Sequence, residues 1–180
     1  MQNGFLGEQR EEESSVCLIF NDRFLGLDNA GKSSILNRLT NGGIHTVSPT
    51  RGYNIKQADI DGTSFAIWDI GGQNSLRSQW TSYLEQTKGI VWVIDSSDRR
   101  RMYETGLELA ALLQDEKLSG VPVLIFANKQ DLITAMKSAE ITIELELHSI
   151  RNRNWHIQDC SALEGTGLSE GMRWLNQSIN

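Results

Sequence analysis

The stretch GLDNAGKS at residues 26–33 matches the pattern G-x-x-x-x-G-K-[ST] at every fixed position. In this pattern the glycines let the backbone curl so that successive N–H groups point at phosphate oxygens, and a helix beginning near Lys32 adds its positive N-terminal end. Lys32 is expected to reach the β- and γ-phosphates, and the hydroxyl of Ser33 is expected to bind Mg²⁺. By itself the motif could also be a glycine-rich turn before a helix. The residues expected to contact the phosphates are Asp28, Asn29, Ala30, Gly31, Lys32, Ser33 and Ser34.

Short apolar runs alternate with amphipathic stretches along the rest of the chain. The runs predict buried strands at residues 16–20, 65–68, 90–94 and 121–127, and residues 155–159 are also strand-like. The amphipathic stretches predict helices at residues 35–39, 102–113 and 168–179. Such alternation predicts an α/β fold, a doubly wound parallel sheet with helices on both faces. Because ligands bind at the carboxyl ends of the strands in such sheets, motifs that directly follow strands are candidates for the site.

A second motif, DIGGQ at residues 69–73, directly follows the predicted strand at 65–68. Asp69 is expected to hold Mg²⁺ through water, and the N–H of Gly72 is expected to contact the γ-phosphate. Gln73 is the candidate catalytic residue because its amide can orient an attacking water. Alone, Asp-x-x-Gly would indicate only a turn.

A third motif, NKQD at residues 128–131, follows the predicted strand at 121–127. A carboxylate at Asp131 can accept from both N1–H and the N2 amine of guanine, and adenine lacks this pair of donors. Asn128 is expected to face the O6 and N7 edge of the base, and Lys129 is expected to lie along its ring.

The base site is completed by a fourth motif, Cys-Ser-Ala at residues 160–162, after the predicted strand at 155–159. The backbone N–H groups of Ser161 and Ala162 are expected to meet O6 of the base. Four motifs in this order, each after a predicted strand, predict a guanine-nucleotide site that uses GTP or GDP and Mg²⁺. A phosphotransferase that uses ATP shares only the first motif, and Asp131 argues against it.

The composition excludes several other classes of protein. The chain has 180 residues, with 17 Lys and Arg against 23 Asp and Glu, so its formal charge of −6 argues against binding along nucleic-acid backbone. Its two cysteines cannot form a disulfide framework, and its longest apolar stretch, residues 89–94, is far short of a membrane-spanning helix. We expect a short acidic leader at residues 1–15, a single domain at residues 16–180, and a location in the cytosol.

The chain resembles the small GTPases of the ADP-ribosylation-factor (Arf) family, and is most similar to the Arf-like proteins of types two and three. The resemblance is carried by GLDNAGKSS, SPTRGYNIK, IWDIGGQNSLRSQW, VIDSSDRRRM, VLIFANKQDL and CSAL. It implies the P-loop small GTPase fold, an α/β fold with a doubly wound, mainly parallel six-stranded sheet and helices on both faces. By this resemblance Thr50 is the threonine that binds Mg²⁺ when a γ-phosphate is present. It also implies that Tyr53, Trp68 and Tyr83 form an aromatic cluster that contacts effectors.

The resemblance further implies a molecular switch that hydrolyses GTP to GDP slowly and binds effector proteins in the GTP state. For the type-two and type-three branch the implied effectors are carriers of lipidated cargo. Binding of the GTPase to a carrier triggers release of the cargo, and the branch is tied to microtubules and cilia. The implied partners also include a GTPase-activating protein and an exchange factor. The implied state is a monomer in the cytoplasm, without bound nucleic acid.

The chain departs from the family pattern at three places. Gln2 replaces the glycine that myristoylation requires, so no stable membrane anchor is expected. Arg51 follows Thr50 directly, and we expect it to be solvated. The segment Asn21-Asp22-Arg23-Phe24 interrupts the apolar strand that should lead into the phosphate loop.

The four extra residues at 21–24 leave alternatives open. Charged side chains in a buried central strand would each cost several kcal/mol unless paired, so a genuine family member is expected to bulge the segment out. A variant transcript or an error in the gene model is the other origin. If the segment misdirects the phosphate loop, the chain would instead be an adaptor with impaired or absent nucleotide binding.

Overall fold

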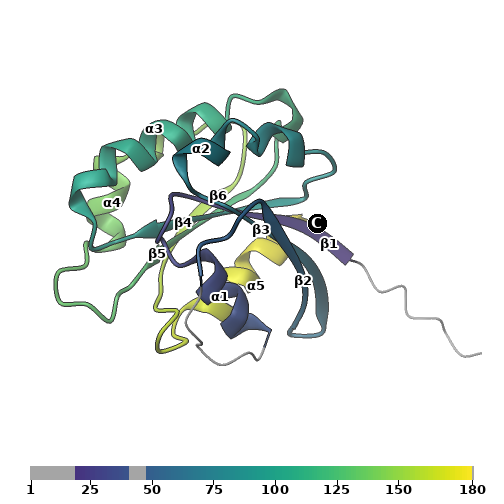
Figure 1. The fold of residues 1–180 in the computed structure, drawn as a ribbon, viewed down its shortest axis with the longest axis horizontal. Helices are drawn as coiled ribbons and strands as arrows, with labels where there is room; N and C mark the ends of the chain where they lie inside the picture. The colour runs from purple at the N-terminus through teal and green to yellow at the C-terminus, as the bar shows by residue number, and fades with distance from the viewer. Residues whose placement is uncertain (1–18, 41–47, 180) are drawn as a thin grey trace, which may run out of the picture.

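The computed structural model describes residues 19–40 and 48–179, which form one six-stranded sheet flanked by helices (Figure 1). The strand order is β2-β3-β1-β4-β5-β6, and only the β2–β3 pair is antiparallel. The strands are β1 Ile19–Leu25, β2 Tyr53–Ile60, β3 Thr63–Ile70, β4 Gly89–Asp95, β5 Val123–Asn128 and β6 Trp155–Asp159. The α-helices are α1 Lys32–Leu39, α2 Asn74–Arg77, α3 Met102–Leu112, α4 Ser138–Glu144 and α5 Leu168–Ile179. The prediction of a mainly parallel α/β sheet is therefore confirmed.

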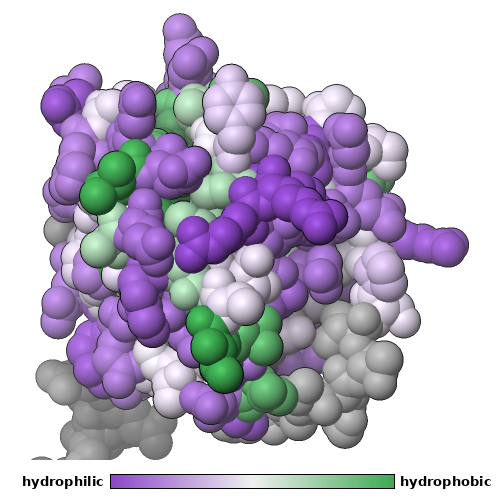
Figure 2. Space-filling view, turned by 90° about the vertical axis from the view of Figure 1, so that its left-hand side faces the viewer, coloured by the Kyte–Doolittle hydropathy of each residue, from purple (hydrophilic) through white to green (hydrophobic). Residues whose placement is uncertain are grey.

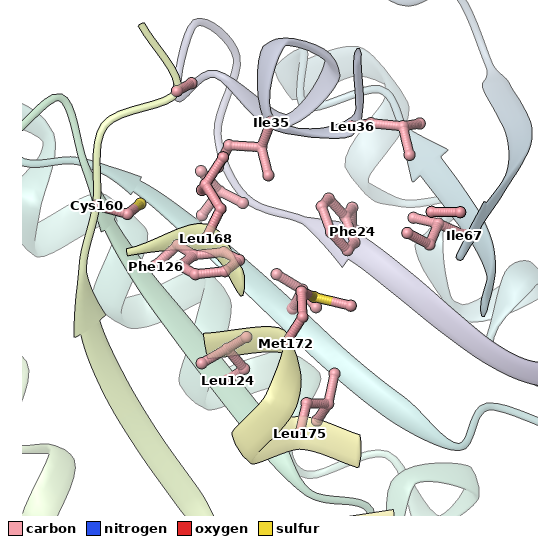
Figure 3. Close-up of a cluster of buried hydrophobic side chains, with 14 of the residues drawn as sticks. Phe24, Ile35, Leu36, Ile67, Leu124, Phe126, Cys160, Leu168, Met172 and Leu175 are labelled. Carbon is pink, nitrogen blue, oxygen red and sulfur yellow. The ribbon is translucent and has the colours of Figure 1, made fainter. Parts of the chain in front are cut away.

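Helices cover both faces of the sheet and bury two apolar clusters. On the face covered by α1 and α5, Phe24, Phe126 and Met172 are buried together (Figure 3). On the face covered by α3 and α4, Trp92 is fully buried, and its Nε1 donates to Thr105 at 3.1 Å. Along α5 the predicted apolar stripe is buried at Leu168, Met172 and Leu175. Burial of such large side chains is the main source of stability for a sheet of this kind.

Strand β1 differs from the sequence-based expectation. It passes through residues 21–24 without a bulge, since its register runs unbroken from Ile19 opposite Ser64 to Phe24 opposite Asp69. Pairing with β4 on the other side continues from Asp22 opposite Gly89. The expectation of a bulge is therefore wrong, because both neighbouring strands pair with this backbone. The apolar residues 16–18, which were predicted to begin the strand, lie outside the described residues.

The two charged residues of this segment are buried in the central strand: Asp22 is completely buried, and Arg23 is 4% exposed. The guanidinium of Arg23 donates to the carbonyls of Tyr83 and Glu85 and lies 4.6 Å from the ring of Trp68. Neither carboxyl oxygen of Asp22 has a hydrogen-bond partner among the described residues. Burial raises the pKa of Asp22 to about 7, against the opposing effect of Arg23. The charge of Arg23 is thus partly compensated by its contacts, whereas the carboxyl of Asp22 has no such compensation.

Three elements have no counterpart in the predicted set: β2, α2 and α4. Strand β2 has five exposed residues at its start and contains no apolar run; it pairs with β3 and buries only Ala58 and Ile60 of its residues. Helix α4 is seven residues long, and the carboxylate of Glu140 in its first turn accepts from the backbone N–H of Lys137 at 3.0 Å. Within residues 19–40 and 48–179, no helix is long and apolar enough to cross a membrane.

The surface at the left of Figure 1 is mainly hydrophilic, and its hydrophobic side chains lie in separate small groups (Figure 2). The exposed large hydrophobic residues of the two helices that cover this side include Tyr103 and Leu107 on α3 and Ile143 on α4. Scattered exposure of this kind is normal and needs no special explanation.

Candidate nucleotide-binding site

The phosphate loop lies between the end of β1 at Leu25 and the start of α1 at Lys32. Gly31 has a φ of 98°, and a Cβ there would lie 2.3 Å from the side-chain nitrogen of Asn128, so only glycine fits. The ammonium of Lys32 donates to the carbonyls of Gly26 at 2.9 Å and Leu27 at 2.8 Å. Because Lys32 is only 6% exposed, burial lowers its pKa to about 8. The loop is therefore curled around this cation, as the motif predicts.

Three side-chain oxygen groups meet beside the loop. The hydroxyl of Ser33 donates to the carboxylate of Asp69 and lies 3.0 Å from the hydroxyl of Thr50, which in turn lies 3.4 Å from Asp69. Asp69 is completely buried, and burial raises its pKa against the hydrogen bond from Ser33. Its Oδ1 has no partner among the described residues. A buried, unpaired carboxylate oxygen beside two hydroxyls is a hard-oxygen donor set that fits Mg²⁺.

Residues 70–73, which follow Asp69 in the second motif, pack directly on the phosphate loop. The carbonyl of Gly72 accepts from the backbone N–H of Asp28 at 3.1 Å. A Cβ on Gly72 would lie 2.5 Å from the ammonium of Lys32, so a side chain is excluded here. Gln73 is exposed and borders the same pocket of about 210 Å³. This pocket is lined by Asp28, Asn29, Gly31, Lys32, Ser33, Ser34, Ser48, Pro49, Thr50, Gly72 and Gln73.

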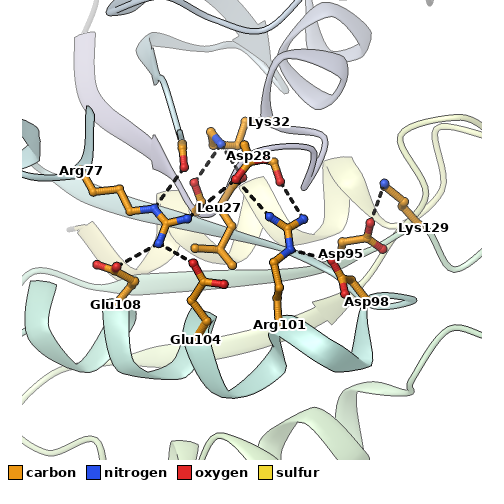
Figure 4. Close-up of polar contacts among 12 residues, drawn as sticks. Leu27, Asp28, Lys32, Arg77, Asp95, Asp98, Arg101, Glu104, Glu108 and Lys129 are labelled. Carbon is orange, nitrogen blue, oxygen red and sulfur yellow. Dashed lines mark hydrogen bonds and ion pairs between the residues drawn. The ribbon is translucent and has the colours of Figure 1, made fainter. Parts of the chain in front are cut away.

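Arg77, which the motifs did not indicate, joins residues 70–73 to helix α3 (Figure 4). Arg77 has a side chain only 7% exposed, and its Nε donates to the carbonyl of Gly72 at 3.1 Å. Its Nη1 donates to Glu104 at 2.7 Å and to Glu108 at 2.9 Å, both on α3. Although burial lowers it, the pKa of Arg77 is raised overall by these two carboxylates. The only signal in the sequence was the i, i+4 spacing of the two glutamates.

A second arginine binds Asp28 of the phosphate loop. Arg101 donates to the carboxylate of Asp28 at 3.0 Å and to its carbonyl at 3.1 Å, while its Nε binds Asp98 at 2.7 Å. Arg77 also lies 3.7 Å from the same carboxylate. The side chain of Asp28 is therefore turned toward arginines, and its backbone N–H already donates to the carbonyl of Gly72, so both groups of this predicted phosphate contact have partners within the protein.

The side chain of Asn128 was expected to face the guanine base, but in the structure it is hydrogen-bonded to other parts of the protein. This residue is 1% exposed, its amide nitrogen donates to the carbonyl of Ala30 at 2.9 Å, and its oxygen accepts from the N–H of Ala162 at 3.0 Å. The N–H of Ser161 donates to the carbonyl of Thr166 at 3.1 Å. Asn128 thus ties the phosphate loop to the 160–162 segment, and the N–H groups of Ser161 and Ala162 are already used within the protein. The reason is that the two loops are close enough for one side chain to span them.

Asp131 and Lys129 border a pocket of about 210 Å³ beside the phosphate loop. The carboxylate of Asp131 accepts from the hydroxyl of Ser161 at 2.5 Å. Gly31 and Ser34 line this pocket and the phosphate pocket alike, so the two are adjacent. The pocket is lined by Gly31, Ser34, Asn128, Lys129, Asp131, Ala162 and Leu163.

The three aromatic residues of the expected effector cluster are in contact. Tyr53 stacks on Trp68 with ring centroids 5.1 Å apart and lies 5.2 Å from the ring of Tyr83. Tyr53 is 45% exposed, and Arg51 is exposed as expected.

The remaining candidate nucleophiles and acid–base residues are packed as structural side chains. Cys160 is 1% exposed, and burial raises the pKa of its thiol, which keeps it unreactive. His148 and His156 pack against the rings of Trp155 and Trp174 respectively. His45 lies outside the described residues.

A parallel sheet whose first strand ends in a curled, lysine-centred loop beside buried Mg²⁺-type oxygens defines a nucleotide-binding protein of the P-loop class. The model of the ADP-ribosylation factor family matches residues 11–179. The chain is 53% identical over 155 residues to ADP-ribosylation factor-like protein 3 of Chlamydomonas reinhardtii, covering 86% of this chain and 88% of that one. It is 49% identical over 156 residues to the protein of the same name from Caenorhabditis elegans, covering 86% and 85%.

Among solved structures, the chain is similar to the Arl6 BBS3 small GTPase of Trypanosoma brucei with the bound nucleotide analogue GppNp. The TM-score is 0.83 at 32% identity, covering 90% of this chain and 98% of that one. The chain belongs to the Arf family of small GTPases, which bind guanine nucleotides, hydrolyse GTP and work with effectors, activating proteins and exchange factors.

Proposed function

We propose that this protein is a GTP-dependent switch whose nucleotide lies across the two adjoining pockets. The observation that carries the proposal is that Lys32, Ser33 and Thr50 line one pocket that shares its wall with the pocket of Asp131. The carboxylate of Asp69 lies beside this pocket, bonded to the hydroxyls of Ser33 and Thr50. The first pocket has the cation and backbone of a phosphate site, and the second has a carboxylate suited to guanine.

In this proposal each residue has a defined role. The phosphates lie against the backbone of residues 28–34, and the ammonium of Lys32 exchanges its loop carbonyls for phosphate oxygens. Ser33 and Thr50 would bind Mg²⁺ directly and Asp69 would bind it through water, and when bound the ion would supply positive charge beside the phosphate oxygens. Gln73 is exposed at the rim of the phosphate pocket, where its amide can orient the attacking water.

The switch follows from two contacts to the γ-phosphate. Thr50 and Gly72 come from two different segments that line the pocket, and both would gain a partner only when GTP is bound. Hydrolysis removes both contacts, so the segments relax and the surface formed by Tyr53, Trp68 and Tyr83 changes.

The finer biology follows from likeness to the type-two and type-three branch. We propose that the effectors are carriers of lipidated cargo, that the protein acts as a monomer, and that it works in the cytoplasm at microtubule- or cilium-related sites. Support comes from the two relatives named ADP-ribosylation factor-like protein 3 and from the exposed aromatic cluster. No nucleic-acid partner and no stable membrane anchor are proposed.

Titration of purified full-length protein with a fluorescent GDP analogue and Mg²⁺ tests this function. Competition by GTP and GDP but not by ATP is expected. Gln73→Leu should retain GDP binding and lose GTP hydrolysis by about a hundredfold or more, as expected when a water-positioning group is removed. Well-folded protein that binds no guanine nucleotide would favour the adaptor alternative and contradict the proposal.

A further inference from the structure

Lys129 lies in the wall of the base pocket and has an unusual backbone conformation. Its backbone is left-handed, with a φ of 67°, which few residues other than glycine adopt. Its ammonium lies 2.6 Å from the carboxylate of Asp95, and the two side chains are 25% and 10% exposed (Figure 4). Asp95 is not among the motif residues that the sequence analysis assigned to the nucleotide.

The carboxylate of Asp95 is fixed at a defined place by its strand. Asp95 ends β4 directly opposite Asn128, which ends β5. One oxygen accepts from the N–H of Ser97 at 3.0 Å and from its hydroxyl at 2.6 Å, which leaves the other oxygen for Lys129. Although burial raises it, the pKa of Asp95 is lowered overall by these hydrogen bonds. The carboxylate is therefore charged and held rigidly before any ligand binds.

This ion pair determines which part of Lys129 faces the pocket. Lys129 lines the base pocket, whereas Asp95 belongs to the separate group of residues behind the phosphate loop. The ammonium is thus drawn out of the pocket and neutralised, and the methylene stem is left in the wall. An apolar, well-ordered stem suits the flat face of a purine, whereas a mobile ammonium would have to be ordered on binding.

We propose that Asp95 is a positioning residue for the guanine base, acting through Lys129. This inference rests on the proposed nucleotide site and adds a residue to it. The competing explanation is that Asp95 only stabilises the turn at residues 95–98 through Ser97. The two explanations differ in whether the effect of Asp95 depends on the ammonium of Lys129.

A double-mutant cycle on the full-length protein separates them, with the dissociation constant of a fluorescent GDP analogue as the readout. Asp95→Asn should weaken binding by about tenfold, the effect of one charge-assisted hydrogen bond. In a Lys129→Met background, where the stem remains but no ammonium is present, Asp95→Asn should cause no further change. Asp61→Asn is the matched control, because its carboxylate is in an exposed ion pair with Arg173 at the distant β2–β3 turn.

An equal loss from Asp95→Asn in both backgrounds would show that Asp95 acts through the turn, and would overturn the inference. No loss at all from Asp95→Asn would overturn it too, while GDP binding by the unmodified protein would leave the proposed function intact. If the unmodified protein bound no GDP, both proposals would fall. Should Asp95→Asn not fold, Lys129→Met and Lys129→Ala give the answer: the alanine variant should bind GDP more weakly, and equal affinities would contradict a stem packed on the base.

Discussion

Asp22 and Arg23 occupy neighbouring positions of the central strand, so their side chains point to opposite faces of the sheet and cannot pair directly. Arg23 finds two carbonyls and an aromatic ring on its side. On the other side, a Cβ added at Gly89 would lie 2.7 Å from an oxygen of Asp22 and 3.1 Å from Leu175, so the carboxyl lies among close, apolar neighbours. Protonation is the main way left to reduce its desolvation cost.

Asp22 should therefore make the protein less stable as pH rises. Its pKa is about 7 in the folded chain and near 3.8 when unfolded, so the folded state binds an extra proton between these values. Its contribution is fully present below the unfolded pKa and is lost as pH rises through the folded pKa. Because of Asp22, the free energy of unfolding should fall by about 3 kcal/mol between about pH 5 and pH 8, and Asp22→Asn should remove this fall. Urea denaturation at each pH measures the free energy of unfolding.

The asparagine variant should thus be more stable than the unmodified protein at high pH. Arg23→Met serves as the comparison, since it removes the neighbouring charge but leaves the carboxyl in place. Parallel stability profiles for the unmodified protein and Asp22→Asn would show that water or other groups reach the carboxyl.

At the scale of elements, helix α3 supports residues 70–73 without lining the phosphate pocket. Glu104 and Glu108 lie one turn apart on the same side of α3, and both bind the guanidinium of Arg77. The same guanidinium holds the carbonyl of Gly72, whose N–H is proposed to contact the γ-phosphate. Helix α3 thus restrains the backbone at Gly72 through the side chain of Arg77, on the carbonyl side of the residue whose N–H is proposed to bind the phosphate.

Arg77→Gln should weaken binding of a non-hydrolysable GTP analogue by about tenfold while changing GDP affinity much less, because Arg77 restrains the backbone at Gly72 and only GTP is proposed to use the N–H of that residue. Glu104→Gln and Glu108→Gln should each have a smaller effect, since one carboxylate remains. Arg99→Gln is the control, because Arg99 forms only an exposed pair with Glu140 at 3.6 Å. Equal losses for both nucleotides would mean that Arg77 supports the fold and not the GTP state.

The elements that could be predicted were those whose burial leaves an apolar signature. Strands β3 to β5 contain apolar runs, and α5 has a regular stripe, so sequence alone located them. Strand β2 is an edge strand held by backbone pairing, which leaves no such pattern. Strand β1 was placed wrongly because pairing on both sides outweighed the cost of two charges. Within the site, the backbone-curling glycines were predictable, whereas the partners of Asn128 and Arg77 depend on contacts between distant loops.

At the scale of the whole molecule, the candidate site joins segments that are far apart in the chain. The phosphate loop follows β1, Asp69 lies in β3, and Asp131 follows β5, yet all three come to the carboxyl edge of one sheet. A nucleotide in the two pockets would contact each of these segments at once. Its binding energy therefore adds to the stability of the entire sheet.

Guanine nucleotides should consequently raise the melting temperature of the full-length protein. GDP with Mg²⁺ at about 100 times its dissociation constant should add about 2.7 kcal/mol, which is about 5–10 °C for a domain of this size. ATP should give no shift in melting temperature, because adenine lacks the two donors from which the carboxylate of Asp131 would accept. Asp131→Ala should abolish the shift that GDP causes. Equal shifts with ATP and GDP would mean that the phosphates alone are bound and that the pocket of Asp131 does not select the base. A shift seen only with guanine nucleotides would instead require both pockets to be occupied together, since the phosphate loop cannot tell the two bases apart.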